Sequence, residues 1–504
     1  MIFLDGNSLA LDDLVAIAFD FAPIALSDDA RVRVRAARDV VEAHARGDSA
    51  VYGINTGFGN FAEVRIPTDS LAALQVNLLR SHAAGVGEPL PVPVVRAMMA
   101  LRANTLAKGF SGIRLETLDL LIELVNRRVH ALVPSRGSVG ASGDLAPLAH
   151  LALVMIGEGE AWHDAARVTG AEALARAGLT PVALVAKEGL ALINGTQAST
   201  AALGLALAAG ERLARAADIA AALSVDALQG STRPLDPRIH EARGFPGQSV
   251  SADNMRALMA HSAINAAHAN CGRVQDAYSM RCAAQVHGAV RTACGFAHQV
   301  VVTEANAATD NPMVFADTAD IVSGGNFHGA PIALAADTLC IAFAQLAAIS
   351  ERRADRLVNP ALSGLPAFLT RHGGLQSGLM MAHVTAAALT SELKTLAHPA
   401  SVDTIPTSAN KEDHVSMSMA AALKAARAVE LARHVVAIEL LCACQAIDLL
   451  APLASSDPLM RVHAHVRREV LSLEDDRSPA RDIDAIAAMI ERGELERACA
   501  LKVN

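Results

Sequence analysis

Aromatic side chains are scarce in this sequence of 504 residues, which has one tryptophan, two tyrosines and twelve phenylalanines. Alanine and leucine recur throughout instead, and 52% of the residues are hydrophobic. Small aliphatic side chains favour helices and let them approach closely. We therefore expect a mainly α-helical, densely packed protein.

Basic clusters are also missing. The chain has 43 Lys and Arg against 52 Asp and Glu, which gives a formal net charge of -9. A nucleic-acid-binding surface needs a basic patch, so we expect no nucleic-acid partner. The opening "MIFLDGNSLALDD" has acidic residues where a secretory signal peptide has basic ones, which predicts no signal peptide.

A membrane span is not expected either. The longest uncharged run, residues 189–210, is long enough to cross a bilayer, but it carries Asn194, Thr196 and Gln197 in its first half. This pattern favours a buried helix.

Cysteine occurs seven times, an odd number without regular spacing, which is typical of a reduced, cytoplasmic protein without structural disulfides. Cys442 and Cys444 lie in the apolar stretch "LLCACQAIDLL", which indicates core thiols rather than metal ligands. On a helix, His463 and His465 would point their imidazoles apart, so we expect no metal site.

The chain divides by pattern at about residue 200. We predict an N-terminal domain over residues 1–200 and a central and C-terminal helical bundle over residues 201–504, because long amphipathic and apolar segments dominate the later part. Glycine-punctuated "VYGINTGFGNF", residues 51–61, predicts a loop that could act as a catalytic lid. Residues 162–170 indicate a small hairpin or loop.

The string "GSVGASGDLAPLAH", residues 137–150, crowds small residues before an apolar helical pattern. If the amide nitrogen of Gly143 attacks the carbonyl carbon of Ala141, a five-membered ring closes, and glycine tolerates the strained backbone. Loss of two waters, one from the Ser142 side chain, would leave a methylidene-imidazolone, a soft electrophile. The plain alternative is a glycine-rich turn with a capping serine.

Asp144 and Pro147 indicate that a helix starts directly after this tripeptide. The positive end of that helix would draw electrons from the ring and make it a better acceptor.

The same string strongly resembles the signature of the aromatic amino-acid ammonia-lyases, and within them the histidine-specific branch. Further stretches agree in order, among them "YGINTGFG", "AKEGLALINGTQAST", "VQDAYSMRC", "SGGNFH" and "TSANKEDHVSM". The resemblance implies a helical fold, a methylidene-imidazolone (MIO) group formed from Ala141-Ser142-Gly143, and no external cofactor. It also implies a homotetramer whose subunits share active sites.

The resemblance assigns roles to particular residues. Tyr52 would be the base that removes the β-proton, provided a cationic or helix-dipole neighbour lowers the pKa of its phenol from about 10. Arg281 would hold the substrate carboxylate through its planar fork. Residues placed beside the prosthetic group are Asn194, Gln275, Tyr278 and Phe327. From residue type alone, an ordinary loop tyrosine, a surface arginine and a structural amide remain alternatives.

Two positions bear on the substrate. His82, after Ser81, and Glu412 match the histidine-specific branch, and a carboxylate with an imidazole is suited to hold another imidazole. The alternatives are a core histidine and a capping carboxylate. Departures from the family pattern are Gly329-Ala330, where a carboxylate is missing, and Ala277, His287, Gln376 and Leu379.

The resemblance therefore implies elimination of ammonia from an aromatic L-amino acid, most simply L-histidine to trans-urocanate. The alternatives within the family are a tyrosine or phenylalanine ammonia-lyase and a 2,3-aminomutase. From other classes, the alternatives are an inactive helical scaffold or oligomerisation partner, and a metallohydrolase. Intact Tyr52, Ser142 and Arg281 argue against the scaffold.

Overall fold

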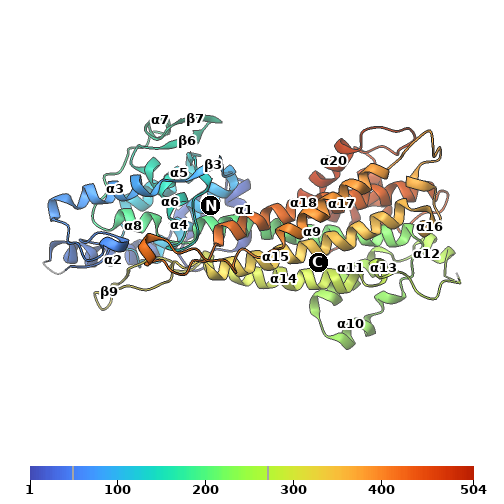
Figure 1. Ribbon diagram of the computed structural model, residues 1–504, viewed down its shortest axis with the longest axis horizontal. Helices are drawn as coiled ribbons and strands as arrows, with labels where there is room; N and C mark the ends of the chain where they lie inside the picture. Colours follow the sequence, from blue (N-terminus) through green and yellow to red (C-terminus); the bar gives the residue numbers. More distant parts are fainter. Residues whose placement is uncertain (48–49, 270–271) are drawn as a thin grey trace. The chain divides into compact units, whose positions relative to one another are not determined.

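The computed structural model describes residues 1–47, 50–269 and 272–504. Two compact units account for the chain (Figure 1). The first unit holds Met1–Ala208, His298–Asp337 and Pro399–Leu423. The second holds Ala209–Ala297, Thr338–His398 and Lys424–Asn504. Two segments from later in the chain thus complete the N-terminal unit.

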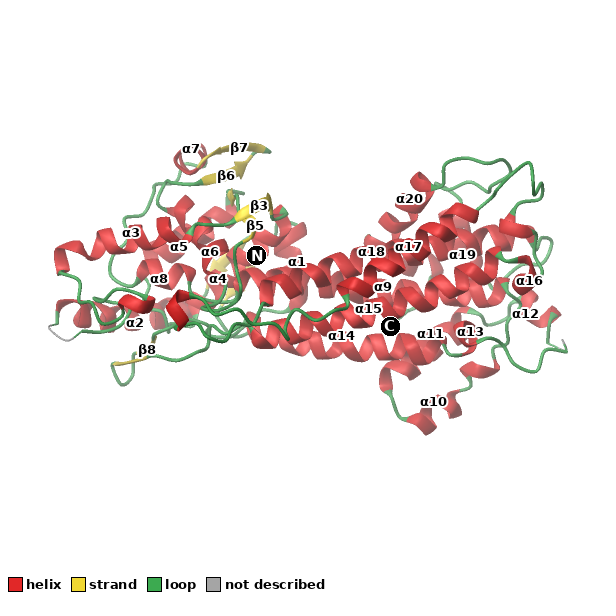
Figure 2. Ribbon diagram, viewed as in Figure 1, coloured by secondary structure: helices red, strands yellow, loops and turns green. Residues whose placement is uncertain are grey.

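Helices dominate both units, which confirms the predicted fold class (Figure 2). The described strands all lie in the first unit, and the second unit, as far as it is described, consists of helices and loops.

The first unit combines helices with short strands. Its helices are α1 (Leu11–Phe19), α2 (Asp28–Arg46), α3 (Leu71–His82), α4 (Val92–Ala107), α5 (Leu115–Asn126), α6 (Leu145–Met155), α7 (Gly170–Arg176) and α8 (Glu188–Ile193), with 3-10 turns η1 (Gly59–Phe61), η2 (Thr68–Ser70) and η5 (Ser408–Asn410). Its strands are β1 (Ile2–Leu4), β2 (Ile24–Leu26), β3 (Val86–Pro89), β4 (His130–Ala131), β5 (Pro134–Arg136), β6 (Glu160–His163), β7 (Ala166–Thr169), β8 (Met313–Phe315) and β9 (Asp320–Val322).

The strands form four small sheets. Strands β1 and β2 pair in parallel, β3 pairs with β5, β8 pairs with β9, and β6 lies between β4 and β7, the last three sheets being antiparallel. The β6–β7 hairpin confirms the turn structure predicted for residues 162–170.

The second unit is a helical assembly. The helices wholly within it are α10 (Pro237–Arg243), α11 (Pro246–Leu258), α12 (Ala263–Ala267), α13 (Tyr278–Arg281), α16 (Pro360–Ser363), α17 (Met380–Leu396), α19 (Asp457–Val466), α20 (Ala480–Glu491) and α21 (Glu494–Cys499), with 3-10 turns η3 (Arg233–Leu235) and η4 (Ala367–Leu369). Four longer helices contain a unit boundary: α9 (Gln197–Ala227), α14 (Ala283–Ala305), α15 (Ala330–Val358) and α18 (Ser418–Leu449).

One apolar core holds the first unit together. It joins α4, α5, α6 and α8 through buried side chains such as Met98, Leu121 and Leu148, and it includes Ala305 and Met419 from the two later segments. Burial of this aliphatic surface is the main stabilising contribution. The loops that carry the site residues are thereby anchored to a rigid scaffold.

The uncharged run at residues 189–210 lies in α8 and α9 and is almost entirely buried, as expected. Among the described helices, α15 alone is long and apolar enough to cross a membrane by length and composition, and 67% of its most apolar window is buried inside the structure. Such burial is typical of a core helix.

Cys442 and Cys444 are buried in α18, and burial raises the pKa of both thiols. This agrees with their prediction as core thiols. Cys271, one of the seven cysteines expected to form no structural disulfide, lies outside the described residues.

Candidate active site

The Ala141-Ser142-Gly143 segment lies immediately before α6, which begins at Leu145 as the sequence predicted. Gly143 has a φ of +77°, and a Cβ atom there would lie 2.2 Å from the carbonyl oxygen of Gly195. Only glycine fits this position, because a side chain would meet both a strained backbone and a steric clash. The residue that would attack in ring closure therefore packs directly against the backbone of Gly195.

Asn194 follows the last residue of α8 and contacts this segment directly. Its Nδ2 donates to the Ser142 carbonyl oxygen at 2.9 Å, while its buried Oδ1 has no hydrogen-bond partner within the described chain. An unpartnered buried acceptor is costly unless a ligand completes it. Asn194 thus fixes the tripeptide and leaves one acceptor open beside it.

Arg102, on α4, holds Asn194 from behind. Its Nη1 donates to the Asn194 carbonyl oxygen at 2.8 Å and to Gln197 Oε1 at 2.9 Å. Burial lowers the pKa of this guanidinium to about 10, so it stays positively charged at neutral pH. A cation is therefore fixed behind the Ser142 segment.

Asp144 does not cap its own helix. Its carboxylate accepts hydrogen bonds from the backbone and hydroxyl of Ser199, at 2.7 and 2.8 Å, and from Ser138 Oγ at 2.9 Å. Asp144 therefore caps the first turn of α9, a favourable place for negative charge. Burial, the largest effect, raises the pKa of this carboxyl although these hydrogen bonds oppose the change.

A cavity of about 1380 Å³ opens in front of Ser142, and the described residues that line it all belong to the first unit. The predicted site residues among its lining are Tyr52, His82, Ala141, Ser142, Asn194, Phe327 and Glu412. These residues come from segments far apart in the sequence. Ser142 and Glu412, for example, are separated by 270 positions. Gly143 is buried beneath this surface.

Glu412 reaches directly to the tripeptide. Its Oε1 accepts a hydrogen bond from Ser142 Oγ at 2.7 Å, and its Oε2 accepts from the hydroxyls of Thr407 and Ser408 at 2.5 and 2.9 Å. Burial opposes ionisation, but these hydrogen bonds and the nearby His82 outweigh it and lower the pKa of Glu412. The cavity therefore contains a carboxylate at neutral pH.

His82 is the last residue of α3. Its Nδ1 lies 2.8 Å from the Leu78 carbonyl oxygen, to which an Nδ1–H can donate, and this tautomer leaves Nε2 as an acceptor. Burial lowers the pKa of the imidazole, and the Leu78 carbonyl and Glu412 oppose this only in part. His82 is accordingly neutral at pH 7.

Tyr52 lies in the glycine-punctuated loop and packs edge-on against Phe58, with ring centroids 6.4 Å apart. Burial raises the pKa of its phenol; a hydrogen bond from the Gly59 backbone lowers it, and the charge of Glu412 raises it further. The first unit alone thus shifts the pKa away from neutrality, whereas a base needs the opposite shift. The predicted cationic or helix-dipole neighbour is not among the groups that act on this phenol within the described residues.

Gln275, Tyr278 and Arg281 belong to the second unit and are not part of the cavity lining. Gln275 is exposed before α13, which carries the other two. The Arg281 guanidinium lies 4.5 Å from the centroid of the exposed Tyr278 ring, a cation–π contact. Its buried Nε has no hydrogen-bond partner within the described residues.

Sequence reasoning missed Arg102, Thr407 and Ser408. Arg102 stands in the apolar stretch "MMALRANTLA", and a buried arginine must find acceptors, which is a usable signal. Thr407 and Ser408 are the first two residues of the quoted "TSANKEDHVSM", but their hydrogen bonds to Glu412 depend on a tight backbone turn that spacing alone does not reveal.

Some departures from the family pattern have structural explanations. Gln376 Nε2 donates to the Glu474 carbonyl oxygen and to Asp475 Oδ1, at 2.9 and 3.0 Å, so it anchors a loop. Ala277 is the N-terminal cap position of α13. The structure does not explain Ala330 or Leu379.

His463 and His465 contact different carboxylates, Asp448 at 2.7 Å and Glu494 at 2.9 Å. Across residues 1–47, 50–269 and 272–504, no group of three or more metal-ligating side chains could hold a metal ion.

Comparison with known proteins agrees with this geometry. The aromatic amino acid lyase family matches residues 9–468. The chain is 57% identical to the histidine ammonia-lyase of Anaeromyxobacter sp. (strain K) over 504 residues, covering 98% of this chain and 99% of that one.

Solved structures are equally similar. The histidine ammonia-lyase of Trypanosoma cruzi has a TM-score of 0.92 at 45% identity, with 99% of this chain and 94% of that chain covered. The tyrosine aminomutase of Streptomyces globisporus has a TM-score of 0.95 at 36% identity, with both chains fully covered. The chain belongs to the aromatic amino acid lyase family, as its sequence motifs predicted.

Proposed function

We propose that the protein is a cytoplasmic histidine ammonia-lyase that converts L-histidine to trans-urocanate and ammonia. The observation that carries this proposal is the placement of His82 and Glu412 in one cavity with Ser142. A neutral imidazole and a carboxylate can accept and polarise the N–H groups of a substrate imidazole. A phenyl side chain would offer no hydrogen bond to His82 Nε2, nor to Glu412 Oε1 once the Ser142 hydroxyl has been lost.

The residues around Ala141-Ser142-Gly143 fit a methylidene-imidazolone formed from this tripeptide, with no external cofactor. Gly143 occupies a position that excludes a side chain, and Asn194 holds the Ser142 carbonyl oxygen. When formed, the group supplies an electron-poor carbon that makes the substrate amine a better leaving group. Asn194, held by Arg102, would keep the segment oriented towards the cavity.

The other residues bind and orient the substrate. Arg281 would bind the carboxylate, because its guanidinium retains unused donor capacity. The open Oδ1 of Asn194 would accept from an N–H of the substrate or of the site. Gln275, Tyr278 and Phe327 would complete the surroundings of the prosthetic group, as the family resemblance implies.

Tyr52 would remove the β-proton, and this role requires a positive charge that the first unit does not supply. Burial and Glu412 raise the pKa of the phenol within that unit. In this proposal the charge comes from the rest of the assembled enzyme, and it must outweigh the desolvation of the phenolate.

Such a site agrees with a homotetramer whose subunits share active sites. The apolar side chains of Ile341, Met381 and Val384 are exposed on α15 and α17 of the single chain. Covering apolar surface of this kind stabilises obligate assemblies. Neither a nucleic acid nor a membrane is a partner in this proposal.

A substrate assay tests the proposed function. The purified protein is incubated separately with L-histidine, L-tyrosine and L-phenylalanine, and the products are identified by chromatography and mass. We expect urocanate to form with the highest kcat/KM, and Glu412→Gln to lower that value for histidine. Fastest turnover of tyrosine or phenylalanine would overturn the substrate assignment, and a β-amino acid product would identify a 2,3-aminomutase.

A further inference from the structure

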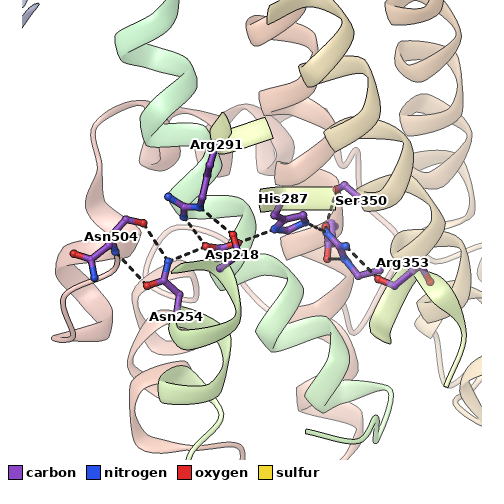
Figure 3. Close-up of polar contacts among 10 residues, drawn as sticks. Asp218, Asn254, His287, Arg291, Ser350, Arg353 and Asn504 are labelled. Atoms are coloured by element: carbon purple, nitrogen blue, oxygen red, sulfur yellow. Dashed lines mark hydrogen bonds and ion pairs between the residues drawn. The ribbon is translucent and has the colours of Figure 1, made fainter. Parts of the chain in front are cut away.

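A buried chain of polar contacts runs through the second unit (Figure 3). At its centre is His287 on α14, one of the departures from the family pattern. His287 Nδ1 lies 2.7 Å from Asp218 Oδ1 on α9, and Arg353 Nη2, from α15, lies 3.4 Å from its Nε2. Arg353 can only donate, so Nε2 is the acceptor and Nδ1–H donates to Asp218.

Arg353 is fully buried and uses all sides of its guanidinium. Nε and Nη2 donate to the two carboxylate oxygens of Glu439 on α18, at 2.5 and 2.9 Å. Glu439 also accepts hydrogen bonds from Ser224 and Ser350, so its charge is well compensated. The planar fork is therefore locked in one orientation.

The remaining nitrogen of Arg353 points to α13. Its Nη1 donates to the carbonyl oxygen of Ser279 at 3.3 Å. Ser279 lies between Tyr278 and Arg281 on this helix of four residues. A single short turn is marginally stable by itself, so its position depends on such contacts.

We propose that Arg353 and His287 are positioning residues for substrate binding. Arg353 fixes α13 through the Ser279 carbonyl oxygen, and His287 fixes the guanidinium from its other side. Together they hold Arg281 where it binds the α-carboxylate of the substrate. This inference rests on the proposed function of Arg281.

The contacts favour this role over a purely structural one. Glu439 alone would satisfy the charge of Arg353, yet Nη1 also donates to a carbonyl oxygen in the substrate-binding motif. A lysine at position 353 could pair with Glu439 but has no fork to reach Glu439, His287 and Ser279 together.

Substituting His287 by Asn or by Gln tests its contact with Asp218 and its contact with Arg353 separately. In His287→Asn the amide lies near the position of Nδ1 and can still donate to Asp218, but it does not reach Arg353. In His287→Gln the longer side chain places an amide oxygen near the position of Nε2, where it accepts from Arg353. His463→Gln is the matched control, because His463 makes a contact of the same 2.7 Å length to Asp448 in the same unit.

The test measures KM and kcat for L-histidine in the full-length enzyme. We expect Arg353→Lys to raise KM by about tenfold and to change kcat by less than about twofold, since a carboxylate contact is made in ground and transition states alike. His287→Asn should raise KM, while His287→Gln and His463→Gln should leave it near the wild-type value.

A double-mutant cycle distinguishes positioning from general destabilisation. If Arg353 acts through Arg281, adding Arg353→Lys to Arg281→Lys should not raise KM further. Independent, multiplying effects would overturn the proposal, as would equal KM values for the Asn and Gln variants at position 287. If Arg353→Lys does not fold, the comparison at position 287 decides.

The proposed function can fail separately. If the wild-type enzyme acts on another aromatic amino acid, the same KM ratios are measured with that substrate, because every one carries an α-carboxylate. An active wild type with unchanged KM in all variants would contradict the positioning role alone.

Discussion

The buried polar groups beside Ser142 in the first unit differ from those around His287 in the second. Beside Ser142 in the first unit, Asp144 is held by neutral donors, Asn194 leaves Oδ1 unpartnered, and Arg102 is held mainly by backbone carbonyls and an amide. In the second unit, Asp218 contacts His287 and Arg291, and Glu439 pairs with Arg353.

The difference separates polar groups that can serve a reaction from polar groups that hold the fold rigid. Incompletely satisfied groups cost stability but are available to a reacting ligand. Fully paired groups hold helices in place and leave nothing for a substrate. The first pattern surrounds the proposed prosthetic group, and the second supports the helix that carries Arg281.

The largest expected effect comes from Ser142→Ala. Without the side-chain hydroxyl the prosthetic group cannot form, so activity should fall by at least about 10³-fold, or about 4 kcal/mol of barrier. Stability should change by no more than about 1 kcal/mol, because the Asn194 contact to the backbone oxygen of residue 142 remains and only the hydrogen bond from the hydroxyl to Glu412 is lost. Turnover and thermal unfolding of the variant are the measurements, and substantial residual turnover would contradict the account.

Glu439→Gln should be the most destabilising change in the second unit. It leaves the fully buried Arg353 without a counter-charge, which costs about 3–5 kcal/mol. The matched change in the first unit, Glu412→Gln, removes a half-buried carboxylate held by hydroxyls and should cost about 1 kcal/mol. Urea midpoints at one protein concentration measure both, and equal losses would remove the contrast between the units.

Acid should weaken the first unit through His130. The pKa of His130 is lowered to about 3, mainly by burial. The positive charges of Arg96 and Arg128 and the neighbouring His163 lower this pKa further. Arg96 also donates a hydrogen bond to His130 Nε2. The unfolded imidazole binds a proton near pH 6.5, so the unfolded state binds more protons between about pH 6.5 and 3. Stability should therefore fall as the pH falls through this range, by up to about 1.4 kcal/mol per pH unit.

The pKa of His287 in the second unit is also lowered by burial, but Asp218 opposes that change. His130→Gln should accordingly remove more of the acid dependence of the unfolding free energy than His287→Gln. The reverse order would show that pairing with a carboxylate does not protect the second unit.

The smallest expected effect is that of Gln376→Asn. The shorter amide cannot keep the hydrogen bonds to the Glu474 carbonyl and Asp475, so the unfolding free energy should fall by about 1 kcal/mol. Activity should not change, because Gln376 lies in the second unit and is not part of the cavity lining. A marked loss of kcat/KM would assign this departure a role in the site.

Local features of the fold could be predicted from the sequence. The helix that starts after Asp144, the hairpin near Trp162 and the buried run at residues 189–210 follow from Pro147, turn residues and apolar pattern, although the Asp144 side chain does not cap that helix. The return of residues 298–337 and 399–423 to the first unit could not be predicted, because it depends on long-range packing such as that of Ala305 and Met419.

For the site, the sequence predicted which residues lie together but not their electrostatic properties. Motifs identified Ser142, Asn194 and Glu412, and the structure places all three at one cavity. Motifs could not predict that the pKa of the Tyr52 phenol is raised, because the burial of Tyr52 and its distance from the charge of Glu412 depend on how the loop folds. The boundary predicted at about residue 200, and the roles of Gln275, Tyr278 and Arg281, stay predictions.

The mass of the intact, purified chain tests the central claim most directly, with Ser142→Ala as its control. We predict that the wild-type chain weighs less than its sequence by two water molecules, and that the deficit maps to the peptide containing Ala141-Ser142-Gly143. A wild-type mass equal to that of the unmodified sequence would contradict the account.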